Sequence, residues 1–285
     1  MEATPLPADS HTHSEWSWDA DFGSMEGSCA RAVEIGLPAI AFTEHVDYTV
    51  WSVTRADLAG HDRLAAKMTD EVTLTPPPFD SDGYFAAIER CRDLFPGLII
   101  LSGMEVGEAH WHAGEVAKML ATGPFDRVIG SLHCLPTGDG SGFGEPWALF
   151  RRRDAFDLVR DYLSGIVDLV RGSDAFEVLT HIDYPLRSWP AATAGPLDLT
   201  VFEEEFRHAL RATAESGRAL EINTRRPLES HIVRWWHESG GDAVSFGSDA
   251  HVPDQVARGF REAAAMAEAH GFRPGPRPFD LWGRA

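Results

Sequence analysis

Side chains that bind metal ions recur along most of this chain, each where a short apolar segment ends. They are His11 and His13, Glu44 and His45, Glu105, His133, His181 and Asp183, and Asp249 and His251. If the apolar segments are parallel strands of one barrel, their carboxyl ends open onto a single mouth, and distant residues converge there. Imidazole and carboxylate ligands suit Zn, Fe and Mn. The pattern therefore predicts one polynuclear metal site.

The prediction depends on the set of residues, because each member alone is weak evidence. His11 and His13 stand two residues apart, which places them on the same face of an extended segment, but such pairs also arise by chance. Glu105 ends a strongly apolar segment, where a carboxylate is costly to bury unless it meets a cation or a hydrogen-bond donor. A buried ion pair with an arginine is the structural alternative for Glu105, and a satisfied core histidine is the alternative for each imidazole.

Composition limits the classes of partner. The 285 residues carry a net charge of −19, and Lys67 and Lys118 are the only lysines among 25 basic residues. Nucleic-acid binding normally depends on a basic surface, so we expect a small phosphorylated metabolite rather than nucleic acid as the partner. The three cysteines form no CxxC pair, and neither a signal peptide nor a stretch of 18 apolar residues is present, so we expect a cytoplasmic protein without a membrane span.

Apolar segments alternate with amphipathic ones, which is typical of an α/β fold with a parallel sheet. We expect strands at 37–45, 98–107, 126–135, 176–184, 219–224 and 243–251, and helices at 24–35, 115–121, 147–171, 199–216, 231–238 and 253–270. The segment 48–78 is expected to be mostly loop. About seven such units with ligands at their ends favour a closed barrel, and no linker divides the chain. We therefore expect one domain, residues 1–285, with tails at 1–8 and 273–285, the second held by an apolar anchor.

Seven short motifs together resemble a known family. In chain order they are HTHSEWSWDA, FTEH, GMEVG, GSLH, THID, EINT and GSDAH. This set is similar to the motifs of the PHP (polymerase and histidinol phosphatase) superfamily, in particular its stand-alone histidinol-phosphatase-like branch, and extends from about Asp9 to Phe272. The resemblance implies a distorted, TIM-like (β/α)7 barrel with a trinuclear metal site at the carboxyl ends of its strands.

The resemblance also assigns ligands to two or three divalent ions. The first ion would take His11, His13, Glu105 and Asp249, with Glu105 bridging to a second ion held by His133 and His181. The third ion would take His45 and His251. The family often has a histidine at the place of Asp19, which is a departure here, because a carboxylate shifts the preference towards harder ions and changes the charge by one.

The activity implied is hydrolysis of a small phosphate monoester, with L-histidinol phosphate as the family-favoured substrate and a place in histidine biosynthesis. Clustered divalent ions suit this reaction, because they provide a bridging hydroxide and neutralise the phosphoryl oxygens. Glu105 would take part through the metals. Asp183 is either a proton donor or support for the ligands, or alternatively it caps a turn. Arginines grip phosphate through paired donors; the candidates are Arg187, ranked first, Arg225, Arg226 and Arg258.

Other functions stay open at this point. A phosphodiesterase or nuclease of the same superfamily is one, although the acidic composition weighs against it. A metal-dependent amidohydrolase is another, but neither lysine stands at a strand end where it would bridge metals. A catalytically silent metal-binding scaffold is the third, supported by Asp19 alone. The second histidine pair, His110 and His112, is expected to lie outside the metal site.

Overall fold

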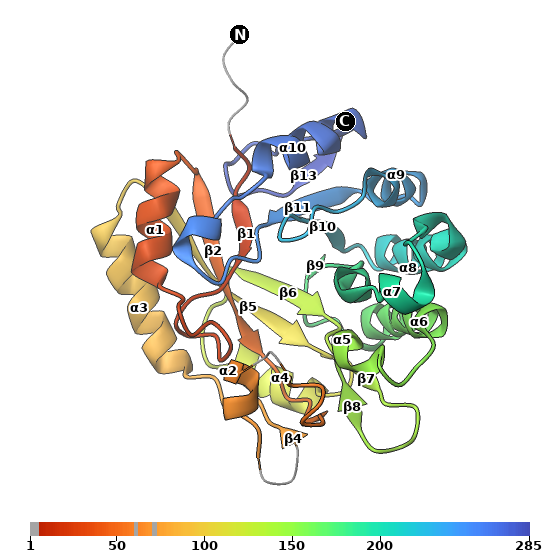
Figure 1. Ribbon diagram of the computed structural model, residues 1–285. Coiled ribbons are helices and arrows are strands. Elements are labelled where there is room, and N and C mark those ends of the chain that lie inside the picture. The colour runs from red at the N-terminus through yellow and green to blue at the C-terminus, as the bar shows by residue number, and fades with distance from the viewer. Residues whose placement is uncertain (1–5, 60–61, 70–72) are drawn as a thin grey trace.

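The computed structural model describes residues 6–59, 62–69 and 73–285. Its centre is a curled sheet that contains nine strands within these residues, in the order β1-β2-β5-β6-β9-β10-β11-β13-β12 (Figure 1). The strands are β1 (Asp9–Thr12), β2 (Ala39–Val46), β5 (Ile99–Gly107), β6 (Arg127–Ser131), β9 (Val178–Leu179), β10 (Ala219–Asn223), β11 (Ala243–Gly247), β12 (Phe272–Arg273) and β13 (Trp282–Arg284). From β1 to β11 every neighbouring pair is parallel.

The curled sheet closes at the carboxyl ends of its strands. The chain just past β11 returns to β1, where the His13 amide donates to the Ala250 carbonyl at 2.8 Å and the Asp249 amide donates to the His11 carbonyl at 2.8 Å. At the opposite end of β11, β13 pairs antiparallel with Ala243 and Val244. The distorted barrel that the sequence predicts is therefore confirmed, and its closure joins the first and last ligand-bearing segments directly.

Helices surround the sheet (Figure 1). They are α1 (Met25–Glu34), α2 (Asp62–Ala66), α3 (Ser81–Leu94), α4 (Ala113–Leu120), α5 (Pro146–Leu149), α6 (Ala155–Gly172), α7 (Ala191–Ala194), α8 (Glu203–Glu215), α9 (Ser230–Glu238) and α10 (Phe260–Ala269), with 3-10 turns η1 (Tyr184–Ser188), η2 (Leu199–Phe202) and η3 (Pro253–Gln255). Their starts follow capping chemistry: the side chains of Ser24 and Asp154 accept from backbone amides in the first turns of α1 and α6. Within the described residues, no helix is both long and apolar enough to cross a membrane.

Several expected elements are shorter or interrupted. The single helix expected at 147–171 is two helices, because Asp154 caps a new start and separates α5 from α6. The strand expected at 176–184 is only β9, and the chain then turns into η1. The helix expected at 253–270 begins at α10, after a turn in which Gly259 has a φ of 75° that favours glycine.

Two segments expected to lack regular structure contribute strands. A second sheet, β4-β3-β8-β7, joins β3 (Trp51–Ser52) and β4 (Thr73–Leu74) from the loop 48–78 to β7 (Leu135–Pro136) and β8 (Phe143–Gly144). Residues 60–61 and 70–72 of that loop, and residues 1–5 of the expected tail 1–8, lie outside the described residues. In the expected tail 273–285, Trp282 is buried, and its ring centroid lies 4.8 Å from that of Phe246. This indole is the apolar anchor, and it brings β13 into the main sheet.

Candidate metal and active site

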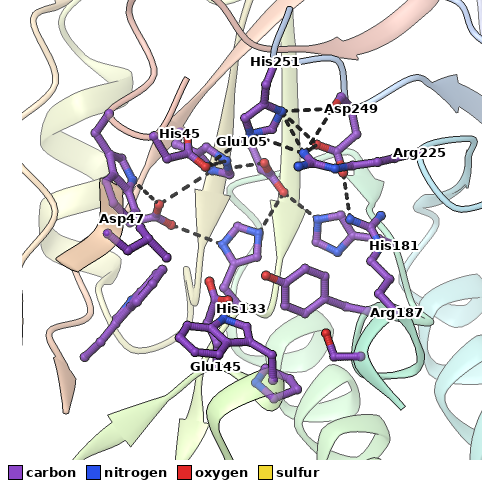
Figure 2. Close-up of a pocket in the computed structure, with 18 residues that line it drawn as sticks. His45, Asp47, Glu105, His133, Glu145, His181, Arg187, Arg225, Asp249 and His251 are labelled. Atoms are coloured by element: carbon purple, nitrogen blue, oxygen red, sulfur yellow. Dashed lines mark hydrogen bonds and ion pairs between the residues drawn. The ribbon is translucent and has the colours of Figure 1, made fainter. Parts of the chain in front are cut away.

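A cavity of about 250 Å³ opens among the carboxyl ends of the barrel strands. Figure 2 shows its lining, in which His45, His133, His181 and His251 surround Glu105. The volume is suited to a small metabolite, because drug-sized ligands usually occupy about 300–1,000 Å³. His11 and His13 lie beneath this surface and are fully buried.

Glu105 is the centre of the cluster. It ends the apolar part of β5 and lies opposite His45 of β2 in the register of the sheet, so both side chains face the same side. Its Oε2 lies 3.2 Å from His11 Nε2 and 3.5 Å from His13 Nε2. Its Oε1 lies 3.2 Å from His133 Nε2 and 2.8 Å from His181 Nε2. One carboxylate therefore offers a separate oxygen to each of two histidine pairs.

Asp249 completes the first group of atoms. Its Oδ1 lies 3.6 Å from His13 Nε2 and 4.0 Å from His11 Nε2. The residue has a φ of 52°, a left-handed conformation that aspartate tolerates better than most residues and that turns the chain sharply after β11. The turn directs Asp249 towards the first pair of histidines, while His251 reaches a third group.

That third group contains Asp19. Its Oδ2 lies 3.2 Å from His251 Nε2 and 3.6 Å from His45 Nε2. The imidazole of His45 stacks on His13 with ring centroids 4.2 Å apart, so the third group adjoins the first. The aspartate that departs from the family pattern therefore lies where a ligand is expected.

The chemistry of the donor atoms fits a cluster of cations. His11 Nε2 and His13 Nε2 are 3.0 Å apart, so two imidazole nitrogens and the carboxylates of Glu105 and Asp249 point at one volume. Groups of three ligand atoms within 4.8 Å of one another occur at His11–His13–Glu105, at His45–Glu105–His133 and at His13–His45–His251. Neutral imidazoles and ionised carboxylates are the ligand forms that Zn, Fe and Mn accept.

Protonation states follow from burial and from neighbouring charges. Burial alone raises the pKa of Glu105, but His11, His45 and His133 outweigh it and hold that pKa well below its usual value. Burial lowers the pKa of His181 to about 4, although Glu105 acts in the opposite direction. Burial, together with His45, His251 and His11, lowers the pKa of His13 far below its usual value. The cluster thus holds Glu105 ionised, with His13 and His181 neutral, at neutral pH.

Carboxylates behind the ligands orient the imidazoles, and the sequence analysis did not identify the main one. Glu221 Oε1 lies 2.5 Å from His11 Nδ1, and its Oε2 accepts from the His181 amide at 3.0 Å. A Cβ at Gly247 would overlap Glu221 Oε1, so only glycine leaves room for this pair. The signal in the sequence was the acid in EINT, inside an expected strand. Carboxylate-to-histidine pairs of this kind support metal sites in general.

Two further acids act similarly. Asp47 Oδ1 lies 3.4 Å from His133 Nδ1, and its Oδ2 accepts from Trp18 Nε1 at 2.9 Å. Glu44, the neighbour of His45, points away from the cavity, where Ser17 Oγ donates to it at 2.5 Å. Ser17 Oγ also lies 3.0 Å from His13 Nδ1, so Glu44 positions His13 through a hydroxyl group.

Two of the four candidate arginines line the cavity, and the other two do not. Arg187 Nη1 donates to Asp249 Oδ2 at 2.8 Å, and its Nε and Nη2 are buried with no hydrogen-bond partner in the described residues. Arg225 Nη1 lies 3.0 Å from Asp249 Oδ1, and both arginines line the cavity. Arg226 donates to the Leu186 carbonyl instead. Arg258 lines a separate depression beside α10, so the structure does not bring it to this site.

Asp183 does not lie in a strand. The strand expected at 176–184 would place it on the same side as His181, but β9 ends at Leu179 and Asp183 is the N-cap residue of η1. Its side chain is buried, caps no backbone amide and is absent from the cavity lining among the described residues. His110 and His112 also lie outside the lining, as expected; His112 Nε2 is 2.9 Å from Thr49 Oγ1.

A parallel barrel with histidines and carboxylates converging at its carboxyl rim defines a class of metal-binding α/β-barrel proteins. Comparison with known families is specific: the model of the PHP domain matches residues 9–225. The chain therefore belongs to the PHP domain family, as the motifs predicted.

Individual proteins of the family share about a quarter of their residues with this chain. The chain is 26% identical over 275 residues to the histidinol-phosphatase of Lactococcus lactis subsp. lactis (strain IL1403), covering 93% of this chain and 91% of that protein. It is 25% identical over 271 residues to a probable histidinol-phosphatase of Thermotoga maritima, covering 93% and 92%.

Two solved structures share the fold. The crystal structure of histidinol phosphate phosphatase from Lactococcus lactis, complexed with Zn, L-histidinol and phosphate, superposes with a TM-score of 0.77 at 22% identity and covers 98% of this chain and 99% of that one. A putative histidinol phosphatase from Listeria monocytogenes superposes with a TM-score of 0.71 at 19% identity, covering 90% and 99%.

Proposed function

We propose that this protein is a metal-dependent phosphatase that hydrolyses a small phosphate monoester, with L-histidinol phosphate as its substrate. The observation that carries the proposal is Glu105, whose two oxygens face two different histidine pairs beside a cavity of metabolite size. The relatives named histidinol-phosphatase, which match nearly the whole chain, support the choice of substrate.

The donor groups suit two or three divalent ions of Zn, Fe or Mn. His11, His13, Glu105 and Asp249 would hold one ion, Glu105 with His133 and His181 a second, and Asp19 with His45 and His251 a third. Ions bound there would supply hydroxide at neutral pH and neutralise charge on the phosphoryl oxygens.

The chain's own contribution is to position these groups and to bind the phosphate. Glu221 and Asp47 fix the rings of His11 and His133, so the opposite nitrogens face the cluster. Arg187 uses Nη1 to hold Asp249, which leaves Nε and Nη2 as adjacent donors of one planar group. Such a pair matches two oxygens of a phosphate. Arg225, on the same rim, adds positive charge towards the dianion.

The test is an assay of the purified protein, loaded separately with Zn, Fe and Mn, combined with metal analysis. The substrates are L-histidinol phosphate, an aryl phosphate, an aryl phosphodiester and a panel of amides. We expect metal-dependent release of phosphate from the monoesters, lost on chelation, with L-histidinol phosphate giving the highest kcat/KM. Faster cleavage of the diester or of an amide, or a fully metallated protein inert towards every phosphate, would refute the proposal.

A further inference from the structure

Glu145 is a buried acid in the cavity wall that the metal cluster does not use. It belongs to none of the ligand groups found among the described residues, and it lies across the cavity from Asp249 and His251 (Figure 2). It precedes α5 at the N-cap position, yet its side chain caps no amide of that helix. The carboxylate instead accepts from the indole of Trp147 and from the hydroxyl of Tyr184.

Within the described residues, no ion pair balances the charge of this acid. Glu145 is 8% exposed and forms no ion pair with any arginine, lysine or histidine in the part of the chain that the structure describes. The two arginines of the cavity are directed at Asp249. Burial raises the pKa of Glu145 to about 7, as expected of a carboxyl group whose charged form has little compensation. A buried carboxylate without a cation is costly, so an arriving cation would be stabilised there.

The surrounding walls also favour a cation. The rings of Trp18, Trp51, Trp147 and Tyr184 line the same cavity as Glu145. Aromatic faces attract organic cations, and this attraction is greatest where water is excluded. The cavity thus has two poles: Arg187 and Arg225 with Asp249 at one, and Glu145 with its donors Trp147 and Tyr184 at the other.

We propose that Glu145 and its aromatic neighbours bind a protonated amine on the alcohol part of the substrate. This inference rests on the proposed function and deepens it, because it assigns the group that recognises the alcohol part of the substrate. Glu145 acts as a substrate-binding residue that forms an ion pair with the amine, while the phosphate is held at the opposite pole. The rival role for a buried acid here is to protonate the leaving oxygen, which would help every alkyl phosphate equally.

The experiment compares two substrates of similar length, 4-aminobutyl phosphate and pentyl phosphate, in the wild type, in Glu145→Gln and in the control Glu115→Gln, whose side chain is exposed. The readout is the ratio of their kcat/KM values. We expect the wild type to prefer the amine by about tenfold or more, and the ratio to fall at least about tenfold in Glu145→Gln, because a desolvated charge pair is lost. Glu115→Gln should keep the wild-type ratio.

A second readout needs no turnover: calorimetric binding of L-histidinol, whose Kd should rise about tenfold or more in Glu145→Gln. An equal loss for both phosphates with an unchanged ratio would assign the rival role and overturn the proposal, as would unchanged L-histidinol binding. If the variant does not fold, a wild type with no preference for the amine overturns it. If no phosphate is hydrolysed at all, the proposed function fails, and L-histidinol binding alone still decides the role of Glu145.

Discussion

At the scale of single residues, two carboxylates make most of the contacts that hold the site together. Glu105 faces five imidazoles with two oxygens, and Asp249 faces three imidazoles and two arginines. A change at either residue would alter several parts of the site together. Residues that touch only one member of the cluster therefore give clearer tests.

Arg187 and Arg258 form a matched pair of that kind, because both were predicted to bind substrate and only Arg187 lines the cavity. We expect Arg187→Ala to raise the KM for L-histidinol phosphate at least about tenfold, since charged hydrogen bonds contribute about 1.5–3 kcal/mol. Arg258→Ala should leave KM unchanged. Steady-state kinetics with metal analysis check both, and an unaltered KM in Arg187→Ala would remove it from the phosphate site.

Glu221 tests the support behind the ligands. Glu221→Gln removes the charge that orients His11, so we expect metal affinity to fall about 10–100-fold, as is typical when such a partner is lost. Competition with a chelator, followed by metal analysis, measures the affinity. Glu262→Gln, at an exposed position on α10, is the control. Equal metal affinity in the two variants would contradict the positioning role.

If Glu145 binds the amine of the substrate, amine binding should depend on pH. Because burial raises its pKa to about 7, the carboxyl group is largely protonated below that pH and gains its charge above it. The affinity for 4-amino-1-butanol should therefore increase from pH 6 to pH 8 and then level off. His133, Asp47 and Tyr184 also face Glu145 and can titrate, but they are present in both the wild type and Glu145→Gln. Their contribution to the pH dependence is therefore the same in the two proteins. Calorimetry on both proteins isolates the difference, and identical pH profiles would exclude Glu145 as the titrating group.

At the scale of elements, the barrel places ligands by parallel register and by the turns that follow its strands. His45 and Glu105 are paired in the register of β2 and β5. Because side chains alternate between the two faces along each strand, both point to the same side of the sheet. The wall that carries Glu145 is built differently, by the start of a short helix. Glu145 is the N-cap residue of α5, and after the break that follows α5, Asp154 caps the start of α6.

The cap of α6 can be tested directly. Asp154 accepts from the amides of Phe156 and Asp157, and its replacement by alanine should lower the free energy of unfolding by about 1 kcal/mol. For a chain of this size that corresponds to roughly 2 °C in Tm. Asp93→Ala, at an exposed position in the last turn of α3, is the control and should not destabilise. Thermal unfolding that fails to separate the two variants would contradict the capping role.

At the scale of the whole molecule, strands near both ends of the described chain complete the barrel. β1 meets the segment after β11 at the rim, and β13 covers the start of β11. The expected organisation as one domain over 1–285 stays a prediction, but the buried Trp282 shows that residues 282–284 are packed against the main sheet.

Trp282 provides the test of that packing. Trp282→Ala should lower the free energy of unfolding by about 3–5 kcal/mol, the usual loss for a large buried aromatic side chain. Trp111→Ala, in which the lost indole is 38% exposed, should cost much less. Chemical denaturation measures both, and equal costs would show that the last strand contributes little to stability.

The sequence by itself determined the α/β alternation and the family, because strand and helix periodicity and short motifs are local patterns. The family resemblance also singled out nine residues as metal ligands, which stay a prediction and which the structure gathers around one cavity. Arg187, predicted to bind phosphate, lines that cavity. What only the tertiary structure decided were the partners that no local pattern reveals: Glu221 behind His11, Asp47 behind His133, and Glu145 with Trp147 and Tyr184 in the cavity wall. It also removed Asp183 and Arg258 from the cavity lining, because β9 ends early and the depression beside α10 is separate. The physical reason is that burial and contact arise between segments that are distant in the chain. His11 and Glu221, for example, are 210 residues apart, and their proximity depends on barrel closure.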